Sequence, residues 1–179
     1  MPAARIVRFA IAAFLFCSLA ASLAAAPQRA ALTDPQITDI AYRAGALDIT
    51  NAELALKRSH DRAVLAFARD MIRDHTAVNR KLLALTRRLH ILAENNPTSQ
   101  ALIRQSDQAR AEIAGLSGAA FDQAYIQNEI AYHRTVNSAL KSELIPDARN
   151  PQLKRLLETG LKIFEGHERH AEAIASRMR

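Results

Sequence analysis

The chain has 179 residues, of which 49% are hydrophobic and 23% charged, and its formal net charge is +6 at pH 7. This composition is typical of one globular domain and excludes a disordered or fibrous chain. With only five glycines and six prolines, the chain favours helices over an all-β sandwich or barrel, and its glycine spacing excludes the phosphate-binding motifs GxGxxG and GxxxxGK.

The first residues predict an export signal. Arg5 and Arg8 form a positive start, and an uncharged, mostly apolar run follows as far as Ala26. Small residues near the end of this run predict that a signal peptide, 1–24, is removed and that 25–33 form a linker. We therefore expect a periplasmic or secreted protein without a stable transmembrane domain after cleavage. An uncleaved membrane anchor is the alternative, because the run is about long enough to span a bilayer.

The only cysteine, Cys17, lies inside this apolar run and is preceded by Phe16 rather than by the small residue of a lipoprotein signal. The exported chain would therefore have no thiol, no disulfide and no cysteine metal site, which suits an oxidising compartment. The positive charge is too small and too dispersed to indicate a nucleic-acid partner. A homo-oligomer and protein partners are left open.

The first two predicted helices follow the linker. Thr33 and Pro35, as a capping residue and a proline in the first turn, predict the start of a helix over 34–59. Asp61 predicts the cap of a second helix, which we expect to end before Pro97. Its apolar seam repeats in steps of four and three residues and consists of Val64, Ala68, Met71, His75, Val78, Leu82, Leu85 and Leu89.

The second half of the chain predicts two further long helices. Residues 98–114 predict a shorter, more polar helix, and a helix over 119–145 is expected to stop at Pro146. Asn150 and the proline after it predict the start of the last helix, whose seam is Leu153, Leu157, Gly160, Phe164, His167, Ala171, Ile174 and Met178. Four amphipathic helices with short connections inside each pair predict an all-α fold, an antiparallel four-helix bundle over 34–179 with the short helix in the long crossover.

Polar residues interrupt the apolar stripes near the middle of each long helix. His75 and His167 take seam positions where the flanking pattern predicts leucine, and His133 lies on the apolar half of its helix with Glu129 one turn before it. Asp48 faces the apolar side of the first helix. At about 1.5 Å rise per residue from the connecting turns, these residues come to similar heights. The sequence therefore predicts one buried polar layer.

Such a layer needs partners, because a buried unpaired polar group costs about 1–3 kcal/mol. One interpretation is a single divalent ion bound by His75, His133 and His167, with Asp48 as the carboxylate and Glu129 as a reserve ligand. This set of ligands suits Zn²⁺, Fe²⁺, Mn²⁺ or Cu²⁺ and does not select among them. The alternative is a hydrogen-bonded His–Asp–Tyr network without metal, built with Tyr125 or Tyr132, in a structural or interaction module.

Other chemistry has little support in the sequence. His167 and His170 lack the HExxH spacing of zinc proteases, and no serine lies in a nucleophile elbow. We predict no catalytic residue and favour a binding role over an enzymatic one. We expect three further residues to orient the ligands by hydrogen bonds to their atoms that do not bind the metal: Asp74, Tyr125 and Tyr132.

Three elements of the sequence carry a resemblance to a known family: the segment from Ala66 to Asp74-His75, a Phe-Asp-x-x-Tyr motif at Phe121 that leads to His133, and His167. Over about 36 to 175, they resemble the ferritin-like envelope proteins catalogued as domain of unknown function 4142. The resemblance implies a ferritin-like four-helix bundle, export, and frequent description as a membrane or outer-membrane protein.

The same resemblance bears on the site. His75, His133 and His167 match the recurrent histidines of the family, and Asp48 stands where members often have Glu, which is longer by one methylene. Di-iron ferritin-like proteins also supply Glu-x-x-His from two helices, a motif that this sequence lacks. Ferroxidase or oxygenase chemistry therefore does not follow from the fold, and a stress-related or sequestration role is expected instead.

The export signal makes the first testable prediction. Protein recovered from its native compartment should begin near Ala25, and an intact-mass measurement will show the loss of the preceding residues. A cytoplasmic product that still begins at Met1 would contradict both the signal peptide and the expected location.

Overall fold

The structure is a computed structural model that describes residues 29–178, so the predicted signal peptide lies outside the described part. Residues from Ala31 onward form a unit of their own. Within the described range the only regular structure is helical, which confirms the all-α prediction. No helix in this range is long and apolar enough to cross a membrane.

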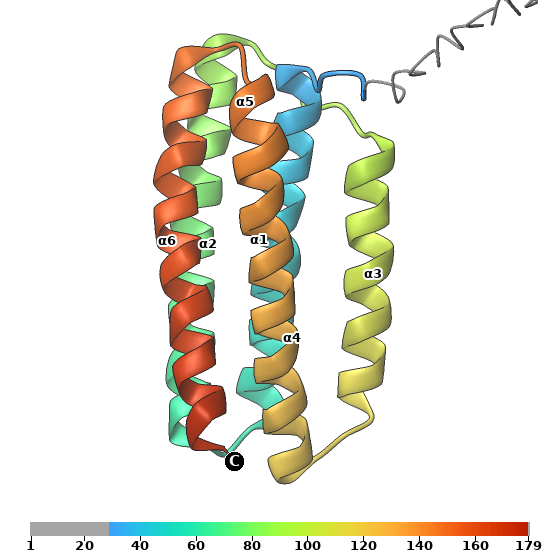
Figure 1. Cartoon of the computed structure of the whole chain (residues 1–179), viewed down its shortest axis with the longest axis vertical. Coiled ribbons are helices and arrows are strands. Elements are labelled where there is room, and N and C mark those ends of the chain that lie inside the picture. Colours follow the sequence, from blue (N-terminus) through green and yellow to red (C-terminus); the bar gives the residue numbers. More distant parts are fainter. Residues whose placement is uncertain (1–28, 179) are drawn as a thin grey trace, which may run out of the picture. The chain divides into compact units, whose positions relative to one another are not determined.

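Long helices lie side by side in this unit (Figure 1). The main contacts join α1 to α2 and α4 to α6, and further contacts join α2 to α6 and α1 to α4. A separate helix, α3, lies against α1 and α4. The bounds are α1 Asp34–Arg58, α2 Arg62–Leu89, α3 Pro97–Ala114, α4 Gly118–Ala139, η1 (a π-helix) Leu140–Leu144, α5 Ile145–Asp147 and α6 Pro151–Arg177.

The predicted capping residues start three of these helices. Thr33 and Gln36 form a capping box at α1, and the Asp61 carboxylate accepts hydrogen bonds from two backbone amides at the start of α2. Asn150 does the same at α6, where a proline occupies the first turn. Each cap satisfies backbone N–H groups that have no partner inside the helix, so local sequence sets where these helices begin.

Two predicted helix ends were wrong. α2 ends at Leu89 rather than shortly before Pro97, because His90 takes a left-handed conformation with φ 53° and closes the helix with backbone hydrogen bonds. In the second half, Pro146 does not stop the helical segment, which continues through α5 to Asp147. The π-helix η1 just before it already leaves the α hydrogen-bond register, so the missing proline N–H falls in a last, irregular turn.

Two apolar clusters form the core, one toward each end of the long helices. The first contains Ala52, Phe67, Met71, Phe121, Tyr125, Ile126, Ala171 and Ile174, among others. The second contains Ile37, Ile40, Leu82, Leu85, Leu140, Leu144, Leu153, Leu157 and Phe164, among others. On every long helix the predicted polar ligand lies between the residues of the two clusters, so the polar layer separates two apolar halves.

Two glycines make a matched test of this packing. A Cβ at Gly45 would lie 2.6 Å from the Asn79 amide oxygen, and Asn79 is buried with its amide nitrogen bonded to the Tyr42 carbonyl. Gly45→Ala should therefore lower the free energy of unfolding by about 1–3 kcal/mol through overpacking. Gly166→Ala meets no atom within 4 Å and should raise it by up to about 1 kcal/mol through helix propensity.

Urea unfolding of the two variants measures both effects. The Gly45→Ala penalty should disappear when Asn79 is also replaced by alanine, because the crowded amide is then gone. Stabilisation by Gly45→Ala alone would show that α1 and α2 do not pack this closely.

Candidate metal centre

Four helices each contribute one side chain to a buried polar cluster between the two apolar clusters. Asp48 on α1, His75 on α2, His133 on α4 and His167 on α6 are 0%, 3%, 1% and 6% exposed. One ring nitrogen of each histidine lies within 4.8 Å of those of the other two. His75 Nε2 and His133 Nε2 lie 2.7 Å and 3.4 Å from Asp48 Oδ2. The four residues that the sequence predicts as ligands therefore lie together.

The three imidazole rings pack closely against one another. Their centroids are separated by 5.7 Å between His75 and His133, 5.3 Å between His75 and His167, and 5.4 Å between His133 and His167. Phe164 stacks on His75 at 4.5 Å with ring planes only 5° apart. This stacking fixes the plane of the His75 ring. The sequence predicts that Phe164 lies on the apolar seam of the last helix, but it does not predict that its ring stacks on His75.

The orientation of His133 is set by its own helix. Its Nδ1 lies 2.9 Å from the Glu129 backbone carbonyl, which can only accept a hydrogen bond. Nδ1 therefore carries the proton, and in the neutral ring Nε2 presents a lone pair toward Asp48. A lone pair that faces a carboxylate oxygen at 3.4 Å needs a proton or a cation between them.

His167 is held in the same manner by a carboxylate. Its Nε2 lies 3.1 Å from Asp74 Oδ2, and Asp74 is in turn paired with Arg73. The Arg73 hydrogen bond lowers the pKa of Asp74, so this carboxylate is ionised and accepts the His167 proton donor. His167 Nδ1 is then the free nitrogen. The predicted supporting residue Asp74 thus acts on His167 rather than on its neighbour His75.

Several buried atoms of this cluster have no hydrogen-bond partner within residues 29–178. They are both carboxyl oxygens of Asp48 and of Glu129, both ring nitrogens of His75, His133 Nε2 and His167 Nδ1. The 2.7 Å approach of His75 to Asp48 is short, yet it lacks the alignment of a hydrogen bond. Two ligands that point at a common centre approach each other in this way.

The two carboxyl groups of the cluster differ in charge. Burial disfavours the charged form of Asp48, but attraction to His75 and His133 outweighs it and brings its pKa below the usual range. Burial, reinforced by repulsion from Asp48, raises the pKa of Glu129 well above its usual value. Glu129 is therefore a neutral carboxylic acid beside an ionised Asp48. It forms a second close group with Asp48 and His133, within 4.8 Å of one another.

The predicted supporting tyrosines lie near the cluster, but neither hydroxyl is bonded to a ligand in the described structure. Tyr132 donates to the Ala44 carbonyl at 2.8 Å, and its ring meets His133 edge-on. The Tyr125 hydroxyl is buried without a hydrogen-bond partner in the described range. Burial raises the pKa of both groups well above 10, so they remain neutral.

Comparison with known proteins assigns the chain to a family. Residues 19–174 match the family described as Domain of unknown function (DUF4142), and the chain belongs to this family. Neither the comparison with curated proteins nor that with solved structures gave a match. The resemblance predicted from the Asp74-His75 and Phe121 elements is therefore confirmed at the level of the family.

Burial of the histidines makes a prediction about acid stability. Burial lowers the pKa of His133, and it lowers that of His167 to about 4, while an unfolded histidine titrates near 6.5. Between these values the unfolded chain binds a proton that the native His167 does not, so the free energy of unfolding falls as the pH drops from about 6.5 to 4. Glu129 acts in the opposite direction, since the native state keeps its proton above the usual pKa.

A comparison with His167→Gln isolates the contribution of His167 to the pH dependence of stability, because Glu129 is present in both proteins. In chelator-treated samples, the stability advantage of the wild type over His167→Gln should shrink by about 2 kcal/mol between pH 7 and pH 5. Urea unfolding at both pH values measures the difference. An advantage that does not change with pH would contradict a neutral, buried His167.

Proposed function

We propose that this chain is an exported, ferritin-like four-helix bundle protein that binds one divalent transition-metal ion through His75, His133, His167 and Asp48. The observation that carries the proposal is that only one of the two ring nitrogens of His133 and of His167 has a hydrogen-bond partner in the described range. On His133 and His167 one nitrogen is committed to an oxygen acceptor, and the other is buried without a hydrogen-bond partner in the described range. Metal-bound histidines have this arrangement, because the outer hydrogen bond fixes the tautomer and the ring orientation.

The charge of the cluster supports a cation. The pKa of His133 and of His167 is lowered by burial, so these rings are neutral near pH 7, and Glu129 keeps its proton. Asp48 is ionised and fully buried. The attraction that keeps Asp48 ionised requires positive charge beside it, and a divalent ion at its oxygens would supply that charge while the rings of His133 and His167 stay neutral. When bound, the metal would take the lone pairs that have no other partner.

The burial of the ligands favours holding a metal over turning over a substrate. All four residues are at most 6% exposed, and Phe164 covers one face of His75. Three imidazoles and a carboxylate suit Zn²⁺, Fe²⁺, Mn²⁺ or Cu²⁺, so the ligands alone do not select the ion. The role we propose is sequestration of such an ion in the cell envelope, with Glu129 as a nearby group that can join the site when it loses its proton.

A metal-free network is the second candidate, and the short contact between His75 and Asp48 favours it. A proton on His75 Nε2 would turn this 2.7 Å contact into an ion pair and would neutralise the buried carboxylate. The protein would then be a structural or interaction module. In that case added metal has no effect on stability.

Replacement of one ligand separates the two candidates. A ligand that binds only the native state stabilises it by about 2.7 kcal/mol at a hundredfold excess over Kd. We expect wild-type protein to melt at a higher temperature with added Zn²⁺ or Mn²⁺, and His75→Leu to lose this rise while it keeps its helical circular dichroism. His60→Leu, at an exposed histidine outside the cluster, is the matched control and should keep the rise.

The metal-free candidate predicts a different pattern. If His75→Leu raises the melting temperature of chelated protein and no metal changes that of the wild type, the histidine is only a polar group in the core. The proposed metal centre is then wrong, whereas the hydrogen-bond network gains support.

A further inference from the structure

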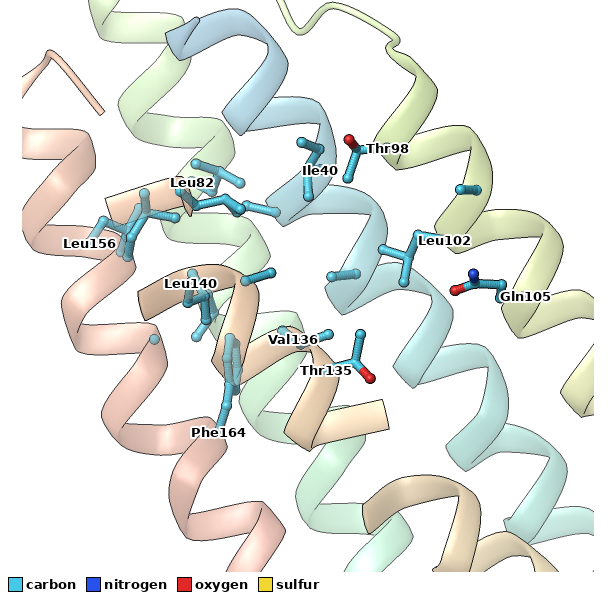
Figure 2. Close-up of a pocket in the computed structure, with 18 of the residues that line it drawn as sticks. Ile40, Leu82, Thr98, Leu102, Gln105, Thr135, Val136, Leu140, Leu156 and Phe164 are labelled. Carbon is cyan, nitrogen blue, oxygen red and sulfur yellow. The ribbon is translucent and has the colours of Figure 1, made fainter. Parts of the chain in front are cut away.

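A cavity of about 430 Å³ lies in the apolar half that contains Ile40 and Leu82, next to the metal centre (Figure 2). Side chains from α1, α2, α3, α4, η1 and α6 line it. Its volume falls in the range of about 300–1,000 Å³ that is typical of small-molecule sites. A small molecule therefore fits the cavity.

The residues that line the cavity disfavour a charged ligand. Aliphatic side chains form most of the wall, and no charged residue of the described range contributes to it. The exposed polar lining residues are Thr98 and Gln105 on α3 and Thr135 on α4, which places the mouth between these two helices. An ionised ligand would lose its hydration there without gaining a partner of opposite charge. A neutral ligand that has a hydroxyl or carbonyl at its outer end could still be hydrogen-bonded at the mouth.

The cavity lies beneath α3, which is attached to the rest of the bundle at both ends. Near one end of α3, the Arg58 guanidinium donates to the Ala114 and Leu116 carbonyls, and at its other end the Asn96 amide donates to the Gln36 carbonyl. Between these attachments, α3 lines the cavity with Ala101, Leu102 and Gln105. This helix is thus held at its ends and leaves space beneath its middle.

The inner wall is shaped by two further features. Leu140 and Leu144 reach the cavity from the π-helix η1, and such π turns often occur at functional sites. Gly160 leaves room for the Phe164 ring, since a Cβ there would lie 3.3 Å from Phe164 Cε2. Phe164 itself lines the cavity with its ring stacked on His75. A molecule in the cavity would thus lie one aromatic ring away from the metal centre.

We infer that this cavity is a binding site for one neutral, apolar small molecule, which enters between α3 and α4 and packs against Phe164. The site is separate from the His–Asp centre and does not require a bound metal. The volume, the uncharged lining and the few polar groups at the mouth are all features of small-molecule sites.

Fluorescence titration with a matched pair of dyes tests the inference on protein purified from its native compartment and treated with chelator. N-phenyl-naphthylamine is neutral and fluoresces in apolar surroundings, whereas anilinonaphthalene sulfonate has the same rings and a negative charge. We expect saturable binding of one neutral dye per chain and at least tenfold weaker binding of the sulfonate. Surface adsorption to a chain with more basic than acidic residues would favour the anion instead.

Variants that fill the cavity locate the dye. Ala101→Phe on α3 and Ala139→Phe on α4 each add a ring at a lining position and should each weaken binding of the neutral dye at least tenfold. Ala111→Phe, at an exposed α3 position outside the cavity, should not change it. Circular dichroism checks the helical content of each variant. Absence of saturable binding to the wild type, equal binding of the two dyes, or unchanged binding in a folded Ala101→Phe or Ala139→Phe variant would overturn the inference.

Discussion

The stability of this fold depends on partners for the buried polar groups that lie between two apolar clusters. Asp48 is ionised and fully buried there, and the lone pairs of His133 and His167 have no hydrogen-bond partner in the described residues. Unpaired, each such group costs about 1–3 kcal/mol, a large part of the stability of a domain this size. The four ligand residues are at most 6% exposed, so bulk water does little to compensate their charge, and a shared ion or a shared proton is needed. A single centre therefore links all four long helices.

The cavity beneath α3 is linked to the polar layer through Phe164. Phe164 belongs both to the stack on His75 and to the cavity wall, so its position couples the polar layer to the apolar half beside it. Gly160 permits that position by leaving out a side chain next to the ring. α3 lies on α1 and α4, outside the ring of contacts among the four long helices, and forms one wall of the cavity.

Most of the fold could be predicted from the sequence, because caps and apolar spacing are local signals. Thr33, Asp61 and Asn150 start their helices as expected. The end of α2 at His90 could not be predicted, since it depends on one left-handed residue other than glycine. The seam histidines pointed to the centre, but the Asp74–His167 pair joins residues 93 positions apart and has no local signal. The cavity was missed for the same reason: spacing predicts which faces are buried and not how completely they fill.

Elemental analysis of protein purified from its native compartment, without chelators, tests the central claim most directly. We expect one divalent transition-metal ion per chain, and its loss when His133 and His167 are both replaced by glutamine. The same purification of His60→Leu should retain the ion. Wild-type protein that carries no transition metal, and takes up none on dialysis against Zn²⁺, Fe²⁺, Mn²⁺ or Cu²⁺, would contradict the account.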